Sequence, residues 1–446
     1  MSSDALLTDL YELTMSAGYW QNRVEARATF ELYCHTMPGP RAFLVACGLR
    51  QALDYIRGLR FTPDDIGYLK AQPAFHNVRG EFFETLSAFR FQGDVWALEE
   101  GEICFASEPI LQVEASVMEA QILETYLLSV FNISTLVASK AGRVVHAAGQ
   151  DGRERMVIDF GSRRAHGPQA GVLAARAAYI AGCAGTSNVF AGKAFGIPVF
   201  GTMAHSWVQA FDREEEAFEK YGHVFPDHTI LLIDTYDTLE AARKVAAMKQ
   251  NIRGVRLDSG DLLALSRKVR RIFDEAGRTD IRIFASGNLN EYKIERLVKA
   301  GAPIDAFGVG TEMVVSRDAP ALDLTYKLVQ LTDPDGTVKF KAKRSRGKQT
   351  VPGRKQVYRH FNRKGLMTRD VIALATEQSP AGFQPLLKQV IRGGDLAEPL
   401  PSTAEIRASV RDKRGALAPA LLKSRGFPAY PVGFSREILR LKKLYK

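Results

Sequence analysis

Residues 254–288 read GVRLDSGDLLALSRKVRRIFDEAGRTDIRIFASGN, and this stretch carries the clearest secondary-structure pattern of the chain. It opens with a short apolar run, continues with apolar residues at three- and four-residue steps, and closes with a second short apolar run. A strand, a helix and a second strand in this order are typical of a parallel βαβ unit. The stretch therefore predicts an α/β protein with a parallel sheet.

The same alternation extends from about residue 155 to residue 315. Six apolar runs are expected as strands, at 156–160, 197–201, 229–234, 254–258, 281–285 and 305–310. Five periodic segments between them are expected as helices, at 168–182, 207–222, 238–250, 262–277 and 290–301. Four glycines are expected as helix caps that tolerate a positive φ, namely Gly182, Gly222, Gly277 and Gly301. Periodicity alone leaves open an irregular barrel or a doubly wound sheet.

The composition is that of an ordinary globular protein. The chain has 446 residues, 46% of them hydrophobic and 25% charged, which is enough for two or three domains with cores of their own. The first ten residues, MSSDALLTDL, do not have the pattern of a signal peptide, and the sequence has no uninterrupted apolar run of 18 residues. The four cysteines are scattered without CxxC spacing, so we expect buried thiols in the cytoplasm and no membrane partner.

Positive charge is concentrated in the last part of the chain. Residues 327–446 contain 26 Lys and Arg against 9 Asp and Glu, a net charge of +17, whereas residues 1–326 have a net charge of −7. A tract such as KFKAKRSRGK (339–348) is compatible with nucleic-acid binding or with a solvated surface. Because no nucleic-acid-binding signature accompanies the charge, we favour the solvated surface.

Each expected strand leads directly into a polar cluster. In parallel α/β folds the carboxyl ends of the strands, and the loops after them, build the functional site. Two of the clusters are rich in small residues and suit the approach of backbone N–H groups to a phosphate: Ser286 with Gly287, and Gly308 and Gly310 with Thr311. Each of these loops taken alone is also compatible with a simple turn.

Charged side chains at the other strand ends also indicate a site for anionic groups. Arg163, Arg164 and Arg256 supply bidentate donors for a diphosphate or a carboxylate. Asp258 is a candidate Mg²⁺ ligand, whereas Asp261, three residues later, is equally suited to cap the next helix. His205 follows a strand in a hydroxyl-flanked loop, and its spacing alone leaves a structural role open. Together the clusters predict a site for a multiply phosphorylated substrate.

Six ordered motifs give the chain a wider resemblance. They are LLTDLYELTM (6–15), FGSRRAHG (160–167), GTSNVFAGKAFGIPVFGTMAHS (185–206), GVRLDSGD (254–261), GVGT (308–311) and TVPGRKQVYR (350–359). In these motifs the chain resembles the nicotinate phosphoribosyltransferase family over nearly its whole length. The resemblance implies an irregular (β/α) barrel of about six strands packed beside an α/β sandwich domain. The expected domains are residues 1–140 (sandwich), 141–330 (barrel) and 331–446 (a basic segment that returns to the sandwich).

The resemblance also implies an activity. It is the ATP-coupled transfer of a phosphoribosyl group from 5-phosphoribosyl 1-diphosphate to nicotinate, with Mg²⁺ held at Asp258, in NAD biosynthesis. Family members are typically homodimers with shared active sites. On this basis Tyr11, supplied by the neighbouring subunit, and Phe160 sandwich the pyridine ring, and His205 is a phosphohistidine.

Other positions match family contacts with the substrates. Thr202 and Arg256 match contacts to nicotinate, and Arg163 matches a contact to diphosphate. Thr311 and the glycines of its loop match contacts to phosphoribosyl diphosphate. Ser187 stands where the related nicotinamide enzyme carries an acid, and a hydroxyl can donate to nicotinate where a carboxylate would repel it. Quinolinate and nicotinamide remain the alternative acceptors, and a nucleic-acid-binding protein is the alternative from another class.

Overall fold

The computed structural model describes residues 4–343, 345 and 349–444. The chain divides into two compact units, one from residues up to Leu136 together with residues from Ala321 onward, and the other from Val137–Pro320. The central unit ends at Pro320 rather than at residue 330, because Leu324–Thr332 forms a strand that pairs with Arg27–Cys34 in the first unit. Residues 344 and 346–348 of the basic tract lie outside the described residues.

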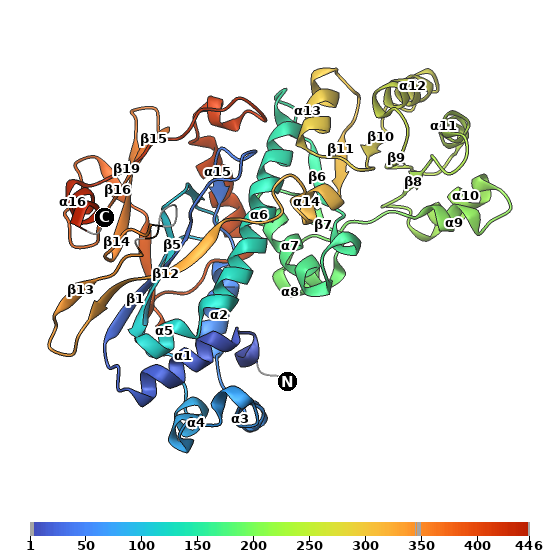
Figure 1. The fold of residues 1–446 in the computed structure, drawn as a ribbon. Coiled ribbons are helices and arrows are strands. Elements are labelled where there is room, and N and C mark those ends of the chain that lie inside the picture. Colours follow the sequence, from blue (N-terminus) through green and yellow to red (C-terminus); the bar gives the residue numbers. More distant parts are fainter. Residues whose placement is uncertain (1–3, 344, 346–348, 445–446) are drawn as a thin grey trace. The chain divides into compact units, whose positions relative to one another are not determined.

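The central unit contains a six-stranded parallel sheet with the order β7-β6-β11-β10-β9-β8 (Figure 1). Its strands are β6 (Met156–Asp159), β7 (Gly185–Thr186), β8 (Ile230–Leu232), β9 (Gly254–Leu257), β10 (Arg282–Ala285) and β11 (Ala306–Val309). Five of the six expected strands are confirmed. The run 197–201 is not a strand: it forms only a single bridge, between Val199 and Thr186, because Pro198 has no N–H to donate. The pair Gly185–Thr186 forms a strand that was not expected, β7, and Val199 bridges to it.

Helices lie between these strands and after the last of them. They are α7 (Pro168–Ile180), α8 (Val189–Phe195), α9 (His205–Gln209), α10 (Glu214–Val224), α11 (Thr238–Ala247), α12 (Leu262–Glu275), α13 (Glu291–Lys299) and α14 (Thr311–Val314). The segment expected as one helix over 207–222 is divided into α9 and α10, and three glutamates in the first turn of α10 favour the new start. Gly182, Gly277 and Gly301 follow helices with positive φ, as predicted, whereas Gly222 lies inside α10.

The first unit is built on a mixed set of sheets. Its largest sheet has seven strands in the order β13 (Val338–Phe340), β12 (Leu324–Thr332), β1 (Arg27–Cys34), β5 (Pro109–Ser116), β3 (Asp94–Leu98), β17 (Leu387–Arg392) and β18 (Asp395–Leu396). A four-stranded sheet contains β16 (Phe383–Pro385), β14 (Lys355–Phe361), β15 (Met367–Leu374) and β19 (Val432–Phe434). A two-stranded sheet pairs β2 (Leu44–Val45) with β4 (Ile103–Cys104). The N-terminal and C-terminal segments thus form one unit.

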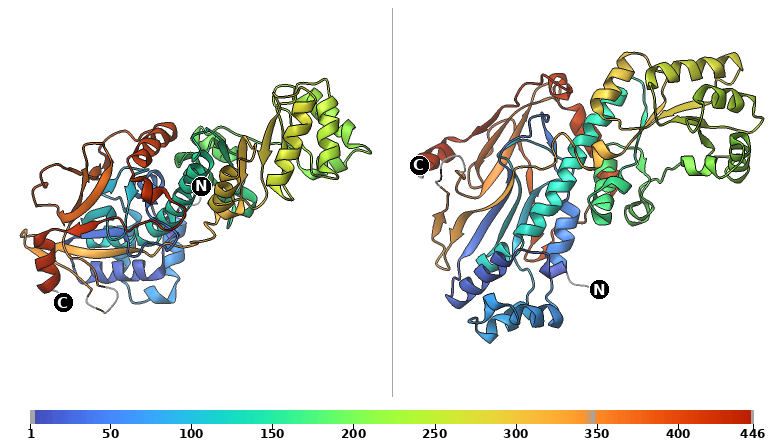
Figure 2. Two further views of the ribbon diagram at one scale, coloured as in Figure 1. Left: turned by 90° about the horizontal axis from the view of Figure 1, so that it is seen from above. Right: turned by 45° about the vertical axis from the view of Figure 1, so that its right-hand side comes forward.

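Helices complete the first unit. They are α1 (Leu10–Gln21), α2 (Leu49–Gly58), α3 (Pro63–Lys70), α4 (Gly80–Ser87), α5 (Val117–Gln121), α15 (Thr403–Gly415) and α16 (Arg436–Leu444), and the long helix α6 (Glu124–Gly149) continues into the central unit. Helices α1, α3 and α4 lie together at one end of the first unit (Figure 2).

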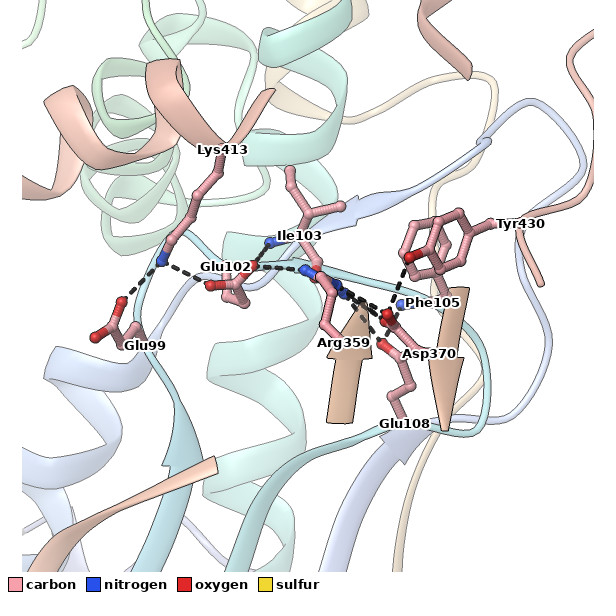
Figure 3. A network of polar contacts seen from close by, with 9 residues as sticks. All are labelled: Glu99, Glu102, Ile103, Phe105, Glu108, Arg359, Asp370, Lys413 and Tyr430. Carbon is pink, nitrogen blue, oxygen red and sulfur yellow. Dashed lines mark hydrogen bonds and ion pairs between the residues drawn. The ribbon is translucent and has the colours of Figure 1, made fainter. Parts of the chain in front are cut away.

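One buried arginine joins strands that are distant in the sequence (Figure 3). Arg359 is fully buried, and its guanidinium donates to Asp370 at 2.6–3.1 Å and to Glu102 at 2.8 Å. Glu108 is also fully buried, and burial beside Asp370 raises its pKa well above the usual range. A buried cation shared by several carboxylates is costly to disturb, because any partner left alone is an unpaired buried charge.

The cysteines and the longest apolar stretch both belong to the interior. All four cysteines are buried thiols, as the sequence predicts. The helical stretch Val117–Gly149 is long and apolar enough to cross a membrane by length and composition. However, 61% of its apolar 18-residue window is buried within the structure. Burial of this kind is typical of core helices.

Candidate active site

A cavity of about 330 Å³ lies within the central unit. Five of the predicted site residues line it: Phe160, Thr202, Arg256, Ser286 and Gly308. Its wall includes residues of β6, β8, β9, β10 and β11, so the parallel sheet curves far enough for strands near both of its edges to share one interior. This curvature is what an irregular barrel requires.

Arg256 supplies a fixed cation in this cavity. It is the third residue of β9, and its Nη1 donates to Thr202 Oγ1 at 2.6 Å. Burial lowers the pKa of Arg256, although Asp258 and Asp234 oppose the shift, and a guanidinium stays charged in proteins. A positioned guanidinium in a partly apolar cavity suits a planar carboxylate.

Phe160 presents an aromatic ring that depends on a neighbouring glycine. Phe160 follows β6 directly, and its backbone N–H donates to the Val309 carbonyl oxygen at 2.9 Å. A Cβ at Gly308 would lie 2.5 Å from two atoms of the Phe160 ring. Gly308 is therefore required for the position of this ring. Gly310 lies beside the same residue, since a Cβ there would lie 3.1 Å from the Phe160 carbonyl oxygen.

The loop after β10 is fixed against the loop after β9. Gly287 has φ +93°, and a Cβ there would lie 1.9 Å from the Asp258 carbonyl oxygen, so no other residue fits. Ser286 Oγ donates to Asp258 Oδ1 at 2.5 Å, and its hydroxyl proton is therefore used within the protein. Asp261 caps α12 through two backbone N–H groups at 3.1 Å, which leaves Asp258 as the candidate metal ligand of the pair.

His205 is the first residue of α9 and faces a carboxylate. Its Nε2 lies 3.4 Å from Asp234 Oδ1, and its side chain is 41% exposed while that of Asp234 is 2% exposed. Asp234 Oδ2 accepts from Ser259 Oγ at 2.6 Å and from the Asp258 N–H at 3.1 Å. Asp234 therefore links the His205 ring to the loop that carries Asp258.

The loop that carries Ser187 is organised by a buried acid. The Ser187 N–H donates to the Asp159 carbonyl oxygen at 2.9 Å, and the Asp159 carboxylate accepts from Thr186 Oγ1 at 2.7 Å and from the Gly161 N–H at 2.9 Å. Burial raises the pKa of Asp159, and these two hydrogen bonds oppose the rise. Asp159 and Asp234 were not predicted as site residues, although each is a carboxylate at the end of a strand, which is the signal that identifies them.

The other predicted residues do not line this cavity, and three of them lie in the following places. Arg163 is exposed in the short helix η3 (Ser162–Arg164), and Thr311 begins α14 directly after Gly310. Tyr11 belongs to the first unit, on α1, where its side chain is 44% exposed. Burial, with Glu124 and Glu12, raises the pKa of Tyr11, so its phenol is neutral near pH 7.

Known proteins match this chain over almost its full length. A model of the nicotinate phosphoribosyltransferase N-terminal domain matches residues 6–132, and a model of the nicotinate phosphoribosyltransferase family matches residues 156–344. The chain belongs to the nicotinate phosphoribosyltransferase family. The resemblance seen in the motifs is thereby confirmed.

Individual family members agree with this assignment. The nicotinate phosphoribosyltransferase pncB2 of Mycobacterium tuberculosis is 43% identical over 98% of this chain and 92% of its own length. The Bacillus subtilis enzyme is 41% identical over 84% of this chain and 77% of its own. The crystal structure of human nicotinic acid phosphoribosyltransferase superposes with a TM-score of 0.86, at 30% identity and 99% coverage of both chains. The predicted fold class is confirmed with it.

Proposed function

We propose that the chain transfers the phosphoribosyl group of 5-phosphoribosyl 1-diphosphate to nicotinate, giving nicotinate mononucleotide and diphosphate in NAD salvage. The observation that carries this proposal is the cavity that Arg256, Thr202 and Phe160 share. It offers a cation for a carboxylate, a hydroxyl that fixes that cation, and an aromatic ring for a planar heterocycle. Ser187, in the loop ordered by Asp159, adds a hydroxyl rather than a negative charge.

The transfer is a displacement at the anomeric carbon by the pyridine nitrogen. The bond from that carbon to the diphosphate oxygen breaks, and positive charge develops on the sugar. The Asp258 carboxylate, oriented by Ser286, stabilises that charge, and Arg163 stabilises the departing diphosphate. Gly287, Gly310 and Thr311 supply the small loops that approach the phosphates.

Asp258 also suits Mg²⁺. Within the part of the chain that the structure describes, no group of three or more His, Cys, Asp or Glu side chains is placed to hold a metal ion. Mg²⁺ typically binds through one or two carboxylates, with water and substrate phosphates completing the shell, so a single Asp258 carboxylate fits. The chemistry that Mg²⁺ supplies there is neutralisation of charge on the diphosphate.

His205 is the proposed site of ATP coupling, as a phosphohistidine. With its Nε2 facing Asp234, the neutral ring carries its proton on that nitrogen and leaves the lone pair of Nδ1 to attack the γ-phosphate. The bond from the γ-phosphorus to the bridging oxygen breaks, and ADP leaves. We further propose a cytoplasmic homodimer in which the exposed Tyr11 of one subunit covers the nicotinate of the other.

Diphosphate release tests this function directly. Nicotinate, nicotinamide and quinolinate are compared as acceptors, each with and without ATP, and nicotinate with ATP is expected to give the highest kcat/KM. His205→Ala should abolish nicotinate-stimulated ATP hydrolysis while the fold is retained. A preference for quinolinate or nicotinamide would overturn the choice of acceptor, and ATP coupling that persists in His205→Ala would overturn the role of the histidine.

Complementation tests the shared site. Inactive Tyr11→Ala and His205→Ala chains, mixed after separate purification, should regain part of the activity if each subunit completes the site of the other. Activity that stays at the background level would place Tyr11 outside the nicotinate site.

A further inference from the structure

A buried lysine in the central unit lies between two carboxylates. Lys140 of α6 is fully buried, and its Nζ lies 2.6 Å from Glu291 Oε2 and 2.8 Å from Asp318 Oδ1. Arg143, one turn later, places Nε 3.1 Å from Glu291 Oε1. We call these four residues the Lys140 cluster. Its two cations balance its two carboxylates, which is the condition under which charges can be buried.

One of the two carboxylates comes directly after the first candidate phosphate loop, and the other comes after the short helix that follows the second loop. Glu291 is the first residue of α13, directly after the loop 286–290. Asp318 follows α14, a few residues after Gly310 and Thr311. One ammonium group of Lys140 therefore contacts the segment that follows each loop.

Both segments contain strained backbone that needs such support. Asn288 has φ +49° and Ser316 has φ +41°, in the left-handed region that residues with a side chain rarely adopt. Strained conformations persist only where their surroundings hold them. A second link joins the same segments: Glu312 accepts from Asn290 at 3.4 Å and pairs with Arg317 at 3.2 Å.

We propose that Lys140 is a positioning residue for phosphoribosyl diphosphate: it fixes the spacing of the loops 286–290 and 308–311 so that both reach the same substrate. This inference rests on the proposed function, in which these loops approach the phosphates. Lys140 itself touches no substrate. Its loss should therefore weaken binding of the phosphorylated substrate and leave the chemistry of bound substrate largely intact.

The variant that tests this keeps the cluster neutral. Lys140→Met alone leaves the cluster with an excess negative charge beside the buried Glu291 carboxylate and can destabilise the fold. The double variant Lys140→Met/Asp318→Asn removes one charge of each sign. The matched control is Lys355→Met/Glu31→Gln, which removes another buried lysine pair, at 2.7 Å, in the first unit.

Steady-state kinetics with Mg²⁺ gives the main readout. For the Lys140→Met/Asp318→Asn enzyme we expect the KM for phosphoribosyl diphosphate to rise at least tenfold, with kcat and the KM for nicotinate within about threefold of wild type. Amide hydrogen exchange should increase in 286–290 and 308–319. The control variant should leave both readouts unchanged.

The outcomes separate this inference from the proposed function. A double variant that folds and keeps the wild-type KM for phosphoribosyl diphosphate overturns the positioning role. Thr311→Val, a change in the loop itself, provides the comparison. If it raises that KM while the double variant does not, only the inference about Lys140 fails. If neither changes it, the assignment of the loops to phosphate fails, and the inference fails with it.

Discussion

Replacing Gly308 by alanine tests how the Phe160 ring is held in the cavity. The new Cβ would lie 2.5 Å from Cδ2 and Cε2 of that ring, whereas non-bonded carbon atoms pack at about 3.5–4.0 Å. The ring or the strand therefore has to move by roughly 1 Å to reach contact distance. Overpacking of this kind costs about 1–3 kcal/mol.

The displacement should appear in nicotinate kinetics. Because a misplacement of about 1 Å can cost on the order of a hundredfold in rate, we expect kcat/KM for nicotinate to fall roughly tenfold to a hundredfold. The assay is diphosphate release at saturating phosphoribosyl diphosphate, with thermal unfolding measured in parallel. Gly149→Ala is the matched control, since a Cβ there meets no atom within 4 Å.

A double-mutant cycle decides whether the clash is the cause. In a Phe160→Leu background the ring is absent, so adding Gly308→Ala should cost much less than it does in wild type. A Gly308→Ala enzyme within twofold of wild type would show that the Phe160 ring does not depend on Gly308, and a loss that is undiminished in the Phe160→Leu background would show that the clash with the ring is not the cause.

Three further predictions concern the first unit and the thiols. Arg359→Met should lower the free energy of unfolding by about 3–5 kcal/mol in denaturant titrations, because it leaves buried carboxylates unpaired, and a loss below about 1 kcal/mol would contradict this. Burial favours a higher pKa for Glu99, but Lys388 and Lys413 outweigh it and lower this pKa to about 2. The contribution of Glu99 to stability is therefore complete above pH 4.5 and is lost as the pH falls toward 2. Glu99 is 45% exposed, so Glu99→Gln should cost under about 1 kcal/mol at pH 7, with the difference from wild type closing between pH 4.5 and 2; a difference that is constant with pH would count against the ion pairs. Burial raises the pKa of Cys34 to about 12, and all four thiols should react with an aqueous thiol reagent only as the chain unfolds, so rapid labelling of the native protein would be inconsistent with their burial.

The sequence predicts the central unit better than the first unit because its signals are local. Each βα repeat carries its own periodicity, and Asp261 caps α12 as its position suggests. The run 197–201 looks like a strand by hydrophobicity, but Pro198 removes a donor and only Val199 pairs. In the first unit β1 pairs with β12, some 300 residues later, and no local pattern reports such a pairing.

The residues of the candidate site also differ in whether the local sequence predicts them. Residues such as Arg256 and Phe160 could be predicted, because position at a strand end and motif both mark them. Asp159 has a local signal, as a carboxylate at the end of a strand, but the loop that it orders is visible only in the structure. Lys140 acts through carboxylates far away in the sequence and has no local signal. The structure is also needed to show which polar groups already hydrogen-bond within the protein, such as the Ser286 hydroxyl, which donates to Asp258.

Asp234 brings the two halves of the proposed reaction into one set of contacts. One of its carboxylate oxygens faces His205, and the other accepts from Ser259 and from the Asp258 N–H. In the proposed ATP coupling, a phosphate on His205 would add negative charge next to the ring that faces Asp234, and a shift of that ring would change the support of the Asp258 loop. Asp234→Asn keeps the shape and the contacts of one oxygen but removes the charge. If ATP is coupled through this carboxylate, the variant should retain basal transfer and lose most of the stimulation by ATP, whereas an equal loss of both would assign Asp234 to the fold of the loop alone.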